Sequence, residues 1–177
     1  MNHISESANI ADGVTIGRFC IVEDGVTIGA GTILGDYAVV YSNASIGRDC
    51  YIGTYTKIGA DVQMGDEVKI TAYGEIRDGC TVGDRTTFGS RCTLSAGTTV
   101  GDDVIVKYGF VATDTPKMGE KEKSVCTLKS GSQYGANVAI MPGVVVGERA
   151  VIGACSQVRH DVGDDEVWFG SPAEKFR

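Results

Sequence analysis

The chain has 177 residues, of which 25 are glycine and only 3 are proline, and its formal net charge is −7. The excess of carboxylates argues against a protein that binds nucleic acid by neutralising phosphates, and the few prolines exclude a collagen-like composition. No apolar run approaches the roughly 18–20 residues that cross a membrane, and the polar start of the chain lacks a secretory core. We therefore expect a cytoplasmic protein without a membrane span.

A large apolar residue recurs at every sixth position from Ile10 to Val106. The column consists of Ile10, Ile16, Val22, Ile28, Leu34, Val40, Ile46, Ile52, Ile58, Met64, Ile70, Ile76, Val82, Phe88, Leu94, Val100 and Val106. Four residues after each member comes a second column, which contains small or β-branched residues from Val14 to Val104. A period of six is typical of a β-solenoid in which each hexapeptide forms one short strand and a turn. We therefore predict an all-β solenoid of triangular coils, with 18 residues in each coil.

Glycine follows the large apolar residue in most repeats, as at Gly17, Gly29 and Gly35. We interpret the large residue as filling a corner of the core, and the small column as lying where the walls come close. The glycine is expected to allow backbone angles that a Cβ would disfavour.

An aromatic column appears when the third residue after the large one is sampled every 18 residues. It reads Phe19, Tyr37, Tyr55 and Tyr73, followed by Arg91. Four aromatic rings one coil apart predict a ladder along one edge of the solenoid. The ladder is either a stacked surface feature or subunit contact, or a platform on which a sugar stacks.

The repeat is interrupted once, by the segment 113–125 with the sequence TDTPKMGEKEKSV. Its close charges (Lys117, Glu120, Lys121, Glu122 and Lys123) indicate a solvent-exposed loop. The pattern resumes from Leu128 to Val158. We predict one domain over 1–177, divided into N-terminal coils 1–112, an extruded loop 113–125, C-terminal coils 126–159 and a terminal cap 160–177. A loop ejected from an otherwise regular repeat is where function is expected.

Cysteine and histidine are placed in a way that argues against a metal site. No CxxC pair occurs, and five cysteines occupy the small interior column: Cys20, Cys50, Cys80, Cys92 and Cys126. We expect these five to be buried thiols in a reducing compartment, whereas Cys155 lies off the column. Since His3 and His160 stand at opposite ends of the repeat, one subunit cannot form a three-histidine zinc site.

Residues 10–158 resemble the hexapeptide-repeat acyltransferases. The most specific stretch is TLKSGSQYGANVAIMPGVVVGERAVIGACSQV, and the final GSPAEKFR is similar to the ending of that family. The resemblance implies a left-handed parallel β-helix, assembly as a homotrimer, and acetyl-CoA as co-substrate.

Within this family the chain looks most like the nucleotide-sugar N-acyltransferases, which acetylate an amine on a nucleotide-linked amino sugar. Thr113, Asp114 and Pro116 match the loop of that branch, although its loop asparagine is missing. After the loop, the match covers 127–129 (TLK) and 135–137 (GAN). The resemblance therefore implies a small-molecule acceptor of this kind.

Thr115 stands where the O-acetyltransferase branch of the family has a catalytic histidine. A hydroxyl acceptor needs a general base, whereas a neutral amine is already nucleophilic. The replacement therefore favours an amine acceptor, or else an inactive site.

The resemblance also implies roles for individual residues. Asn137 is expected to orient the amine or polarise the carbonyl, and Asp114 to accept the released proton. Backbone amides near Gly135 and Ala154 are expected to contact the pantetheine or the thioester oxygen. The basic positions that meet CoA phosphates in relatives are occupied here by Arg159 and Lys175. Each side chain also has a structural interpretation, as a turn asparagine, a loop-capping carboxylate or a solvated terminal charge.

The sequence thus predicts a CoA-dependent N-acetyltransferase that works by direct attack of the amine on the thioester. Two alternatives remain open: a non-catalytic scaffold that uses the aromatic column as its contact surface, and an acetyltransferase for another small amine.

Overall fold

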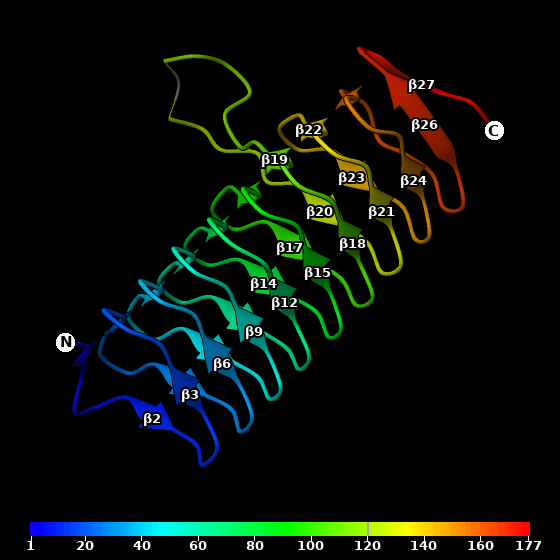
Figure 1. Ribbon diagram of the computed structural model, residues 1–177. Helices are drawn as coiled ribbons and strands as arrows, with labels where there is room; N and C mark the ends of the chain where they lie inside the picture. The colour runs from blue at the N-terminus through cyan, green and yellow to red at the C-terminus, as the bar shows by residue number, and fades with distance from the viewer. Residues whose placement is uncertain (120) are drawn as a thin grey trace.

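The computed structural model describes residues 1–119 and 121–177, and Glu120 of the predicted loop lies outside the described residues. The described chain forms a left-handed parallel β-solenoid of about nine turns, without a helix. The coils stack in chain order from the N-terminus to the C-terminal hairpin (Figure 1). The prediction of fold class is therefore confirmed.

Three parallel sheets form the walls of the solenoid. Sheet A contains β1 (His3–Ile4), β4 (Ile21–Val22), β7 (Val39–Val40), β10 (Lys57–Ile58), β13 (Glu75–Ile76), β16 (Thr93–Leu94), β19 (Val111–Ala112), β22 (Ala139–Ile140) and β25 (Gln157–Val158). Sheet B contains β2 (Asn9–Ile10), β5 (Thr27–Ile28), β8 (Ser45–Ile46), β11 (Gln63–Met64), β14 (Thr81–Val82), β17 (Thr99–Val100), β20 (Thr127–Leu128) and β23 (Val145–Val146). Sheet C contains β3 (Thr15–Ile16), β6 (Ile33–Leu34), β9 (Tyr51–Ile52), β12 (Lys69–Ile70), β15 (Thr87–Phe88), β18 (Ile105–Val106), β21 (Gln133–Tyr134), β24 (Val151–Ile152), β26 (Val167–Gly170) and β27 (Ala173–Lys175).

Each two-residue strand has one outward and one inward side chain, because successive side chains alternate across a strand. In β10, Lys57 is exposed and Ile58 is fully buried. Ile58 pairs in register with Ile76 of the next coil in sheet A, 18 residues on. The large apolar column therefore lies on the flat inner faces of the sheets, and the prediction that it fills the corners is wrong.

Four residues link consecutive strands, and we number them as the first to fourth turn positions. The chain bends at the third position, where φ is positive in residues such as Tyr55 (59°) and Asn137 (56°). The glycines that follow the large residue stand at the first position instead, and they do not adopt positive φ. At Gly17, an added Cβ would lie 2.7 Å from the backbone nitrogen of Asp36 in the next coil. These glycines make room for the neighbouring coil, so the predicted reason for the glycine was wrong.

Three corners run along the solenoid, and we name each by the sheets that its turns connect. The C–A corner has the following residues at its third turn position: Phe19, Tyr37, Tyr55, Tyr73, Arg91, Gly109, Asn137 and Cys155. The A–B corner contains the interruption of the repeat, between β19 and β20.

The aromatic column forms a continuous stack on the C–A corner. Its ring centroids are 5.1, 4.7 and 5.2 Å apart from Phe19 to Tyr73. Because the ring faces cover one another, Tyr37 and Tyr55 present only their edges to solvent. The inner rings therefore offer no face on which a sugar could stack.

The thiols lie as expected. All six cysteines are free; Cys155 is exposed and the five of the interior column are buried. Burial raises the pKa of these thiols, in Cys80 to about 11, so they are protonated at neutral pH and chemically inert.

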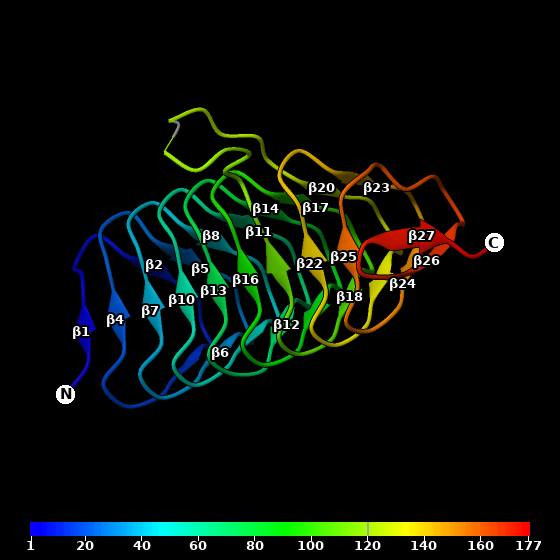
Figure 2. The same ribbon diagram turned by 90° about the horizontal axis from the view of Figure 1, so that it is seen from above.

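The loop after β19 projects from the A–B corner and leans over the preceding coils (Figure 2). Beyond β25 the end of the solenoid is covered by β26 and β27, which form an antiparallel pair. The only tryptophan, Trp168, pairs with Ile152 in register and packs against the core.

Candidate active site

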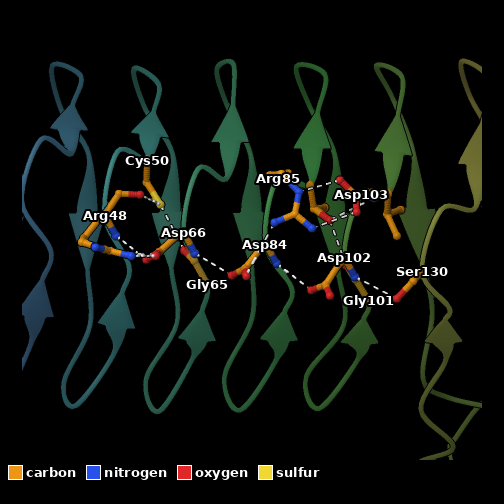
Figure 3. Close-up of polar contacts among 12 residues, drawn as sticks. Arg48, Cys50, Gly65, Asp66, Asp84, Arg85, Gly101, Asp102, Asp103 and Ser130 are labelled. Carbon is orange, nitrogen blue, oxygen red and sulfur yellow. Dashed lines mark hydrogen bonds and ion pairs between the residues drawn. The ribbon is translucent and has the colours of Figure 1, made fainter.

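The amide at the second turn position points along the solenoid axis and has no partner within its own coil. On the B–C corner, this amide is capped in most coils from that of Arg48 onward by a side chain at the same position of the next coil (Figure 3). The N–H groups of Arg48, Asp66 and Asp84 donate to carboxylates 2.8–2.9 Å away. The acceptors are Asp66, Asp84 and Asp102, respectively.

Among the described residues, the C–A corner lacks these caps after its first turn, where the amide of Arg18 donates to Asp36 at 2.8 Å. In the coils that flank and follow the loop, its second turn position is occupied by Tyr108, Ala136 and Ala154, and an alanine methyl cannot accept a hydrogen bond. Among the residues that the structure describes, none accepts a bond from the amides of Ala136 and Ala154. Two backbone donors on neighbouring coils are therefore open to solvent, roughly 4.8 Å apart by the strand spacing.

Gly135 stands next to these donors but does not supply one. Its own N–H donates to the carbonyl of Ile152 at 2.8 Å as part of sheet C. What Gly135 provides is space, because an added Cβ would lie 2.5 Å from the nitrogen of Ala154. Of the two backbone positions that the sequence predicts, Ala154 offers a free amide, and the second free amide belongs to Ala136.

A shallow pocket of about 290 Å³ lies on sheet C beside Gly135. Its walls include Ile105, Lys107, Gly135 and Gly153. Underneath lies Tyr134, which is fully buried and whose hydroxyl donates to Oγ of Ser132 at 3.0 Å. The pocket is open and mostly apolar, and two of its lining residues, Gly135 and Gly153, directly precede Ala136 and Ala154 in the chain.

Asn137 follows Ala136 at the third turn position and is exposed. Its backbone N–H donates to the carbonyl of Tyr108 at 2.9 Å. Its side chain lies against Gly109 in the preceding coil, where an added Cβ would overlap Oδ1 of Asn137. A carboxamide is thus held directly beside the two free donors.

Asp114 lies on a different edge, at the base of the loop on the A–B corner. Only 8% of Asp114 is exposed. Its Oδ1 accepts hydrogen bonds from Nζ of Lys123 at 3.0 Å and from Oγ1 of Thr115 at 2.9 Å. The hydrogen bond from Lys123 is the main cause that lowers the pKa of Asp114, against the opposing effect of burial. Asp114 is therefore a carboxylate at neutral pH.

A pocket of about 420 Å³ opens beside Asp114 on the outer side of sheet A. Its lining includes Arg77, Ser95, Val111, Met118 and Met141. Arg77 adds a favourable charge that also lowers the pKa of Asp114.

The structure does not bring Asp114 and Asn137 together within one chain. Asn137 lies one coil after Gly109 on the C–A corner, because the strand that follows it, β22, pairs in register with β19. Gly109 and Asp114 are separated by five residues along sheet A, which corresponds to roughly 16 Å at the rise of an extended strand. Two halves of the predicted site therefore stand on opposite edges of the same sheet.

Arg159 and Lys175 are both engaged within the chain. Arg159 follows β25 at the A–B side and donates twice to Oε1 of Gln157, at 2.8 and 2.6 Å. Lys175 in β27 forms a 2.6 Å ion pair with Glu166. This ion pair is the main cause that lowers the pKa of Glu166 to about 2, with help from the indole N–H of Trp168.

Charge is distributed unequally over the corners. The carboxylates at the second and third turn positions of the B–C corner are Asp12, Asp49, Asp66, Glu67, Asp84, Asp102, Asp103, Glu148, Asp164 and Asp165, and the arginines there are Arg48, Arg85 and Arg149. At the same positions of the C–A corner the charged residues are Arg18, Asp36 and Arg91. The edge with the free amides is therefore the edge on which an anion is best tolerated.

Within residues 1–119 and 121–177, no group of three or more metal-binding side chains is placed to hold a metal ion. In the same residues no helix has the length and apolar character needed to cross a membrane.

Comparison with protein families identifies the repeat. Residues 7–42 match the family described as bacterial transferase hexapeptide (six repeats). Residues 79–113 and 135–156 match the hexapeptide repeat of succinyl-transferase. The matches lie on both sides of the loop, so the two parts of the solenoid are built from the same repeat.

A curated relative and several solved structures are similar to the chain. A galactoside O-acetyltransferase of Lactococcus lactis is 37% identical over 62 residues, which are 35% of this chain and 30% of that protein. The chain thus aligns with under a third of this relative. A UDP-N-acetylglucosamine acyltransferase of Francisella novicida is 20% identical, with a TM-score of 0.68, over 98% of this chain and 67% of the other. The polySia-specific acetyltransferase NeuO is 22% identical, with a TM-score of 0.58, over 98% of this chain and 87% of the other. These structures share the fold.

Proposed function

We propose that this hexapeptide-repeat protein transfers an acetyl group from acetyl-CoA to the amine of a nucleotide-linked amino sugar. The observation that carries the proposal is the pair of uncapped amides at Ala136 and Ala154, beside Asn137. The names of its relatives, a galactoside O-acetyltransferase and two acyl- or acetyltransferases, support acyl transfer as the activity.

In the reaction, the neutral amine attacks the thioester carbon. The carbonyl oxygen gains negative charge and accepts a hydrogen bond from the amide of Ala136, which points along the axis toward the coil of Ala154. A preformed donor of this kind lowers the barrier by about 2.7–4 kcal/mol. The parallel amide of Ala154 is left for the pantetheine. A C–N bond forms, the C–S bond breaks, CoA leaves as the thiolate, and the nitrogen loses one proton.

The acetyl donor is placed by the pocket on sheet C. The pantetheine arm lies against Gly135 and Gly153, which brings the thioester to the free amides. The phosphates of CoA then face the least acidic edge of the chain. Arg159 and Lys175 take part only if the phosphates displace their present partners, Gln157 and Glu166.

Asp114 acts from a neighbouring subunit of a homotrimer. Within one chain it stands across sheet A from Asn137, so a single subunit carries two incomplete halves. If subunits pack with one C–A corner against the next A–B corner, each interface completes one site. Asp114 is ionised, attracts the cationic form of the acceptor amine, and takes the proton that becomes acidic once the C–N bond forms.

The first test is acetyl-CoA turnover by the purified protein against a panel of nucleotide-linked amino sugars and matching hydroxy sugars. The proposal expects CoA release with amino sugars only. Absence of turnover, together with no thermal stabilisation at millimolar CoA, would instead identify a non-catalytic scaffold.

The second test mixes two inactive variants, Asp114→Ala and Asn137→Ala, after joint unfolding and refolding. Each variant alone lacks one half of every site. In a randomly mixed trimer about a quarter of the interfaces regain both residues, so activity should recover to about a quarter of the wild-type value. No recovery from two well-folded variants would show that the halves do not meet between subunits.

A further inference from the structure

A second pocket opens on the C–A corner, on the N-terminal side of Asn137. It has a volume of about 390 Å³ and is lined by Ala72, Tyr73, Ser90, Arg91 and Tyr108. It lies where the aromatic stack ends. The side chains that line it have no part in the reaction described above.

Arg91 differs from the other arginines at the second and third turn positions of the corners. Arg18, Arg48, Arg85 and Arg149 each form an ion pair with an aspartate of the next coil, at 2.6–2.8 Å. The residue one coil after Arg91 in the same column is Gly109, which has no side chain to offer. In the part of the chain that the structure describes, no carboxylate pairs with Arg91.

The guanidinium of Arg91 instead lies over the ring of Tyr73, with its carbon 5.8 Å from the ring centroid. Stacking on an aromatic face restricts the side chain and leaves the N–H donors of the guanidinium at its edge. The planar fork of donors matches the oxygens of a phosphate. Tyr108, which is 59% exposed, forms a wall of the pocket.

The position of this pocket relative to Asn137 decides what it can hold. Arg91, Gly109 and Asn137 follow one another in one column, one coil apart. Two coil spacings separate Arg91 from Asn137, or roughly 10 Å. A hexose with a phosphate on its anomeric carbon and an amine across the ring bridges such a span. Ala154 lies one coil further in the same direction, at the thioester.

We propose that the pocket of Tyr73, Arg91 and Tyr108 binds the anomeric phosphate or diphosphate of the acceptor, with Arg91 as the anion contact. The order along the corner is then phosphate at Arg91, amine at Asn137 and thioester at Ala154. This inference rests on the proposed function for the identity of the acceptor. It explains why one arginine on this edge is left without an aspartate.

The test measures binding of inorganic pyrophosphate, the group common to nucleoside-diphosphate sugars, by calorimetry at low ionic strength. Arg91→Ala should weaken binding about 10- to 100-fold, as for loss of hydrogen bonds to a charged group. Arg91→Lys should recover part of the loss, since it keeps the charge without the fork. The matched control is Arg18→Ala, which removes an exposed arginine from the same corner.

Acetyl-CoA also carries a diphosphate, so its binding is measured on the same variants. The proposal expects the affinity of Arg91→Ala for acetyl-CoA to stay within about twofold of wild type. Pyrophosphate binding that is unchanged in Arg91→Ala, or a loss confined to acetyl-CoA, overturns the proposal.

Turnover separates this inference from the proposed function. With a nucleotide-linked amino sugar, Arg91→Ala should raise KM for the sugar and leave kcat unchanged. If wild type binds pyrophosphate through Arg91 but transfers no acetyl group, the proposed function fails and the anion site stands. If transfer proceeds and Arg91→Ala leaves KM for the sugar unchanged, only the anion site fails.

Discussion

The uncapped amide of Ala136 can be closed by one substitution, Ala154→Asp. At the B–C corner, Asp84 accepts a bond from the amide of Asp66 at 2.9 Å. The glycine before that amide, Gly65, leaves room for the carboxylate, since an added Cβ would overlap Oδ1 of Asp84. Gly135 stands in the same place before Ala136, so an aspartate at position 154 should cap Ala136 in the same way.

The substitution is expected to move stability and activity in opposite directions. A side-chain cap on an orphan amide stabilises by about 0.5–2 kcal/mol, and an exposed site belongs at the low end of that range. For a chain of this length, about 1 kcal/mol corresponds to a rise in Tm of about 2–4 °C. The same carboxylate removes one oxyanion donor, which lowers kcat about 10²–10³-fold.

The matched control is Thr54→Asp, five coils away on the same C–A corner. Gly35 precedes the amide that it would cap, and an added Cβ there would lie 2.6 Å from the nitrogen of Thr54. This variant should gain similar stability and keep full activity. Thermal unfolding by circular dichroism and acetyl-CoA turnover are the assays. If Ala154→Asp keeps wild-type kcat, the amide of Ala136 does not stabilise the transition state; if it lowers Tm, the capping geometry is wrong.

Three further predictions follow from the structure. Tyr55→Ala removes two ring stacks of 4.7 and 5.2 Å, and should cost about 1–3 kcal/mol in urea unfolding, with Thr54→Ala as a neighbouring control. A thiol reagent should modify Cys155 alone in the native protein and all six cysteines in urea, whereas fast labelling of a second native thiol would contradict the burial. The ion pair holds the pKa of Glu166 at about 2, below its ordinary value of 4.5. The Glu166 carboxylate therefore stabilises the fold at pH values above 4.5, and this stabilisation is lost as the pH falls through about 2. Lys175→Met should therefore lower Tm at pH 7, and the difference from wild type should shrink toward pH 2, while a constant difference would refute the linkage.

The solenoid could be predicted because a period of six leaves few alternatives. Seventeen consecutive repeats set the strand, the buried face and the coil length. The role of the glycines at the first turn position could not be predicted from the sequence. A sequence shows that Gly17 recurs in phase with its neighbours, but it does not show that Asp36 of the next coil lies 2.7 Å from the place of its Cβ.

The candidate site was predicted in part. Ala154 and Asn137 were found by resemblance, and both lie at the open amides. Ala136 was missed, and alanine at the second turn position is not a signal by itself, because Ala72 stands at the same position of the same corner. Asp114 and Asn137 were placed together because both lie close to the loop in the sequence. Around a coil, five residues are enough to carry the chain to another edge.

The contacts of the loop could not be predicted from the sequence. Residues 113–125 have no repeat to fix their register, so the partner of Asp114 among the nearby lysines was not determined. The structure selects Lys123, whose ammonium also contacts Oγ1 of Thr115 at 2.7 Å. Thr115 is therefore part of the cluster that keeps Asp114 ionised.

A regular solenoid repeats the same unsatisfied amide at every corner of every coil. Proteins satisfy most such backbone donors with side chains or water. Here the aspartates of the B–C corner accept the hydrogen bonds of many of these amides. The same aspartates make the B–C corner strongly acidic, so it repels anionic ligands. On the C–A corner no carboxylate follows Asp36 at the second or third turn position: positions 136 and 154 are alanine, and the last arginine of the column, Arg91, has glycine as its neighbour. The absence of carboxylates thus has two consequences on one edge: a backbone amide is free to bind an oxyanion, and a guanidinium is free to bind a phosphate. Both are required for transfer of an acetyl group from acetyl-CoA, which is an anion, to a nucleotide-linked sugar, which is also an anion.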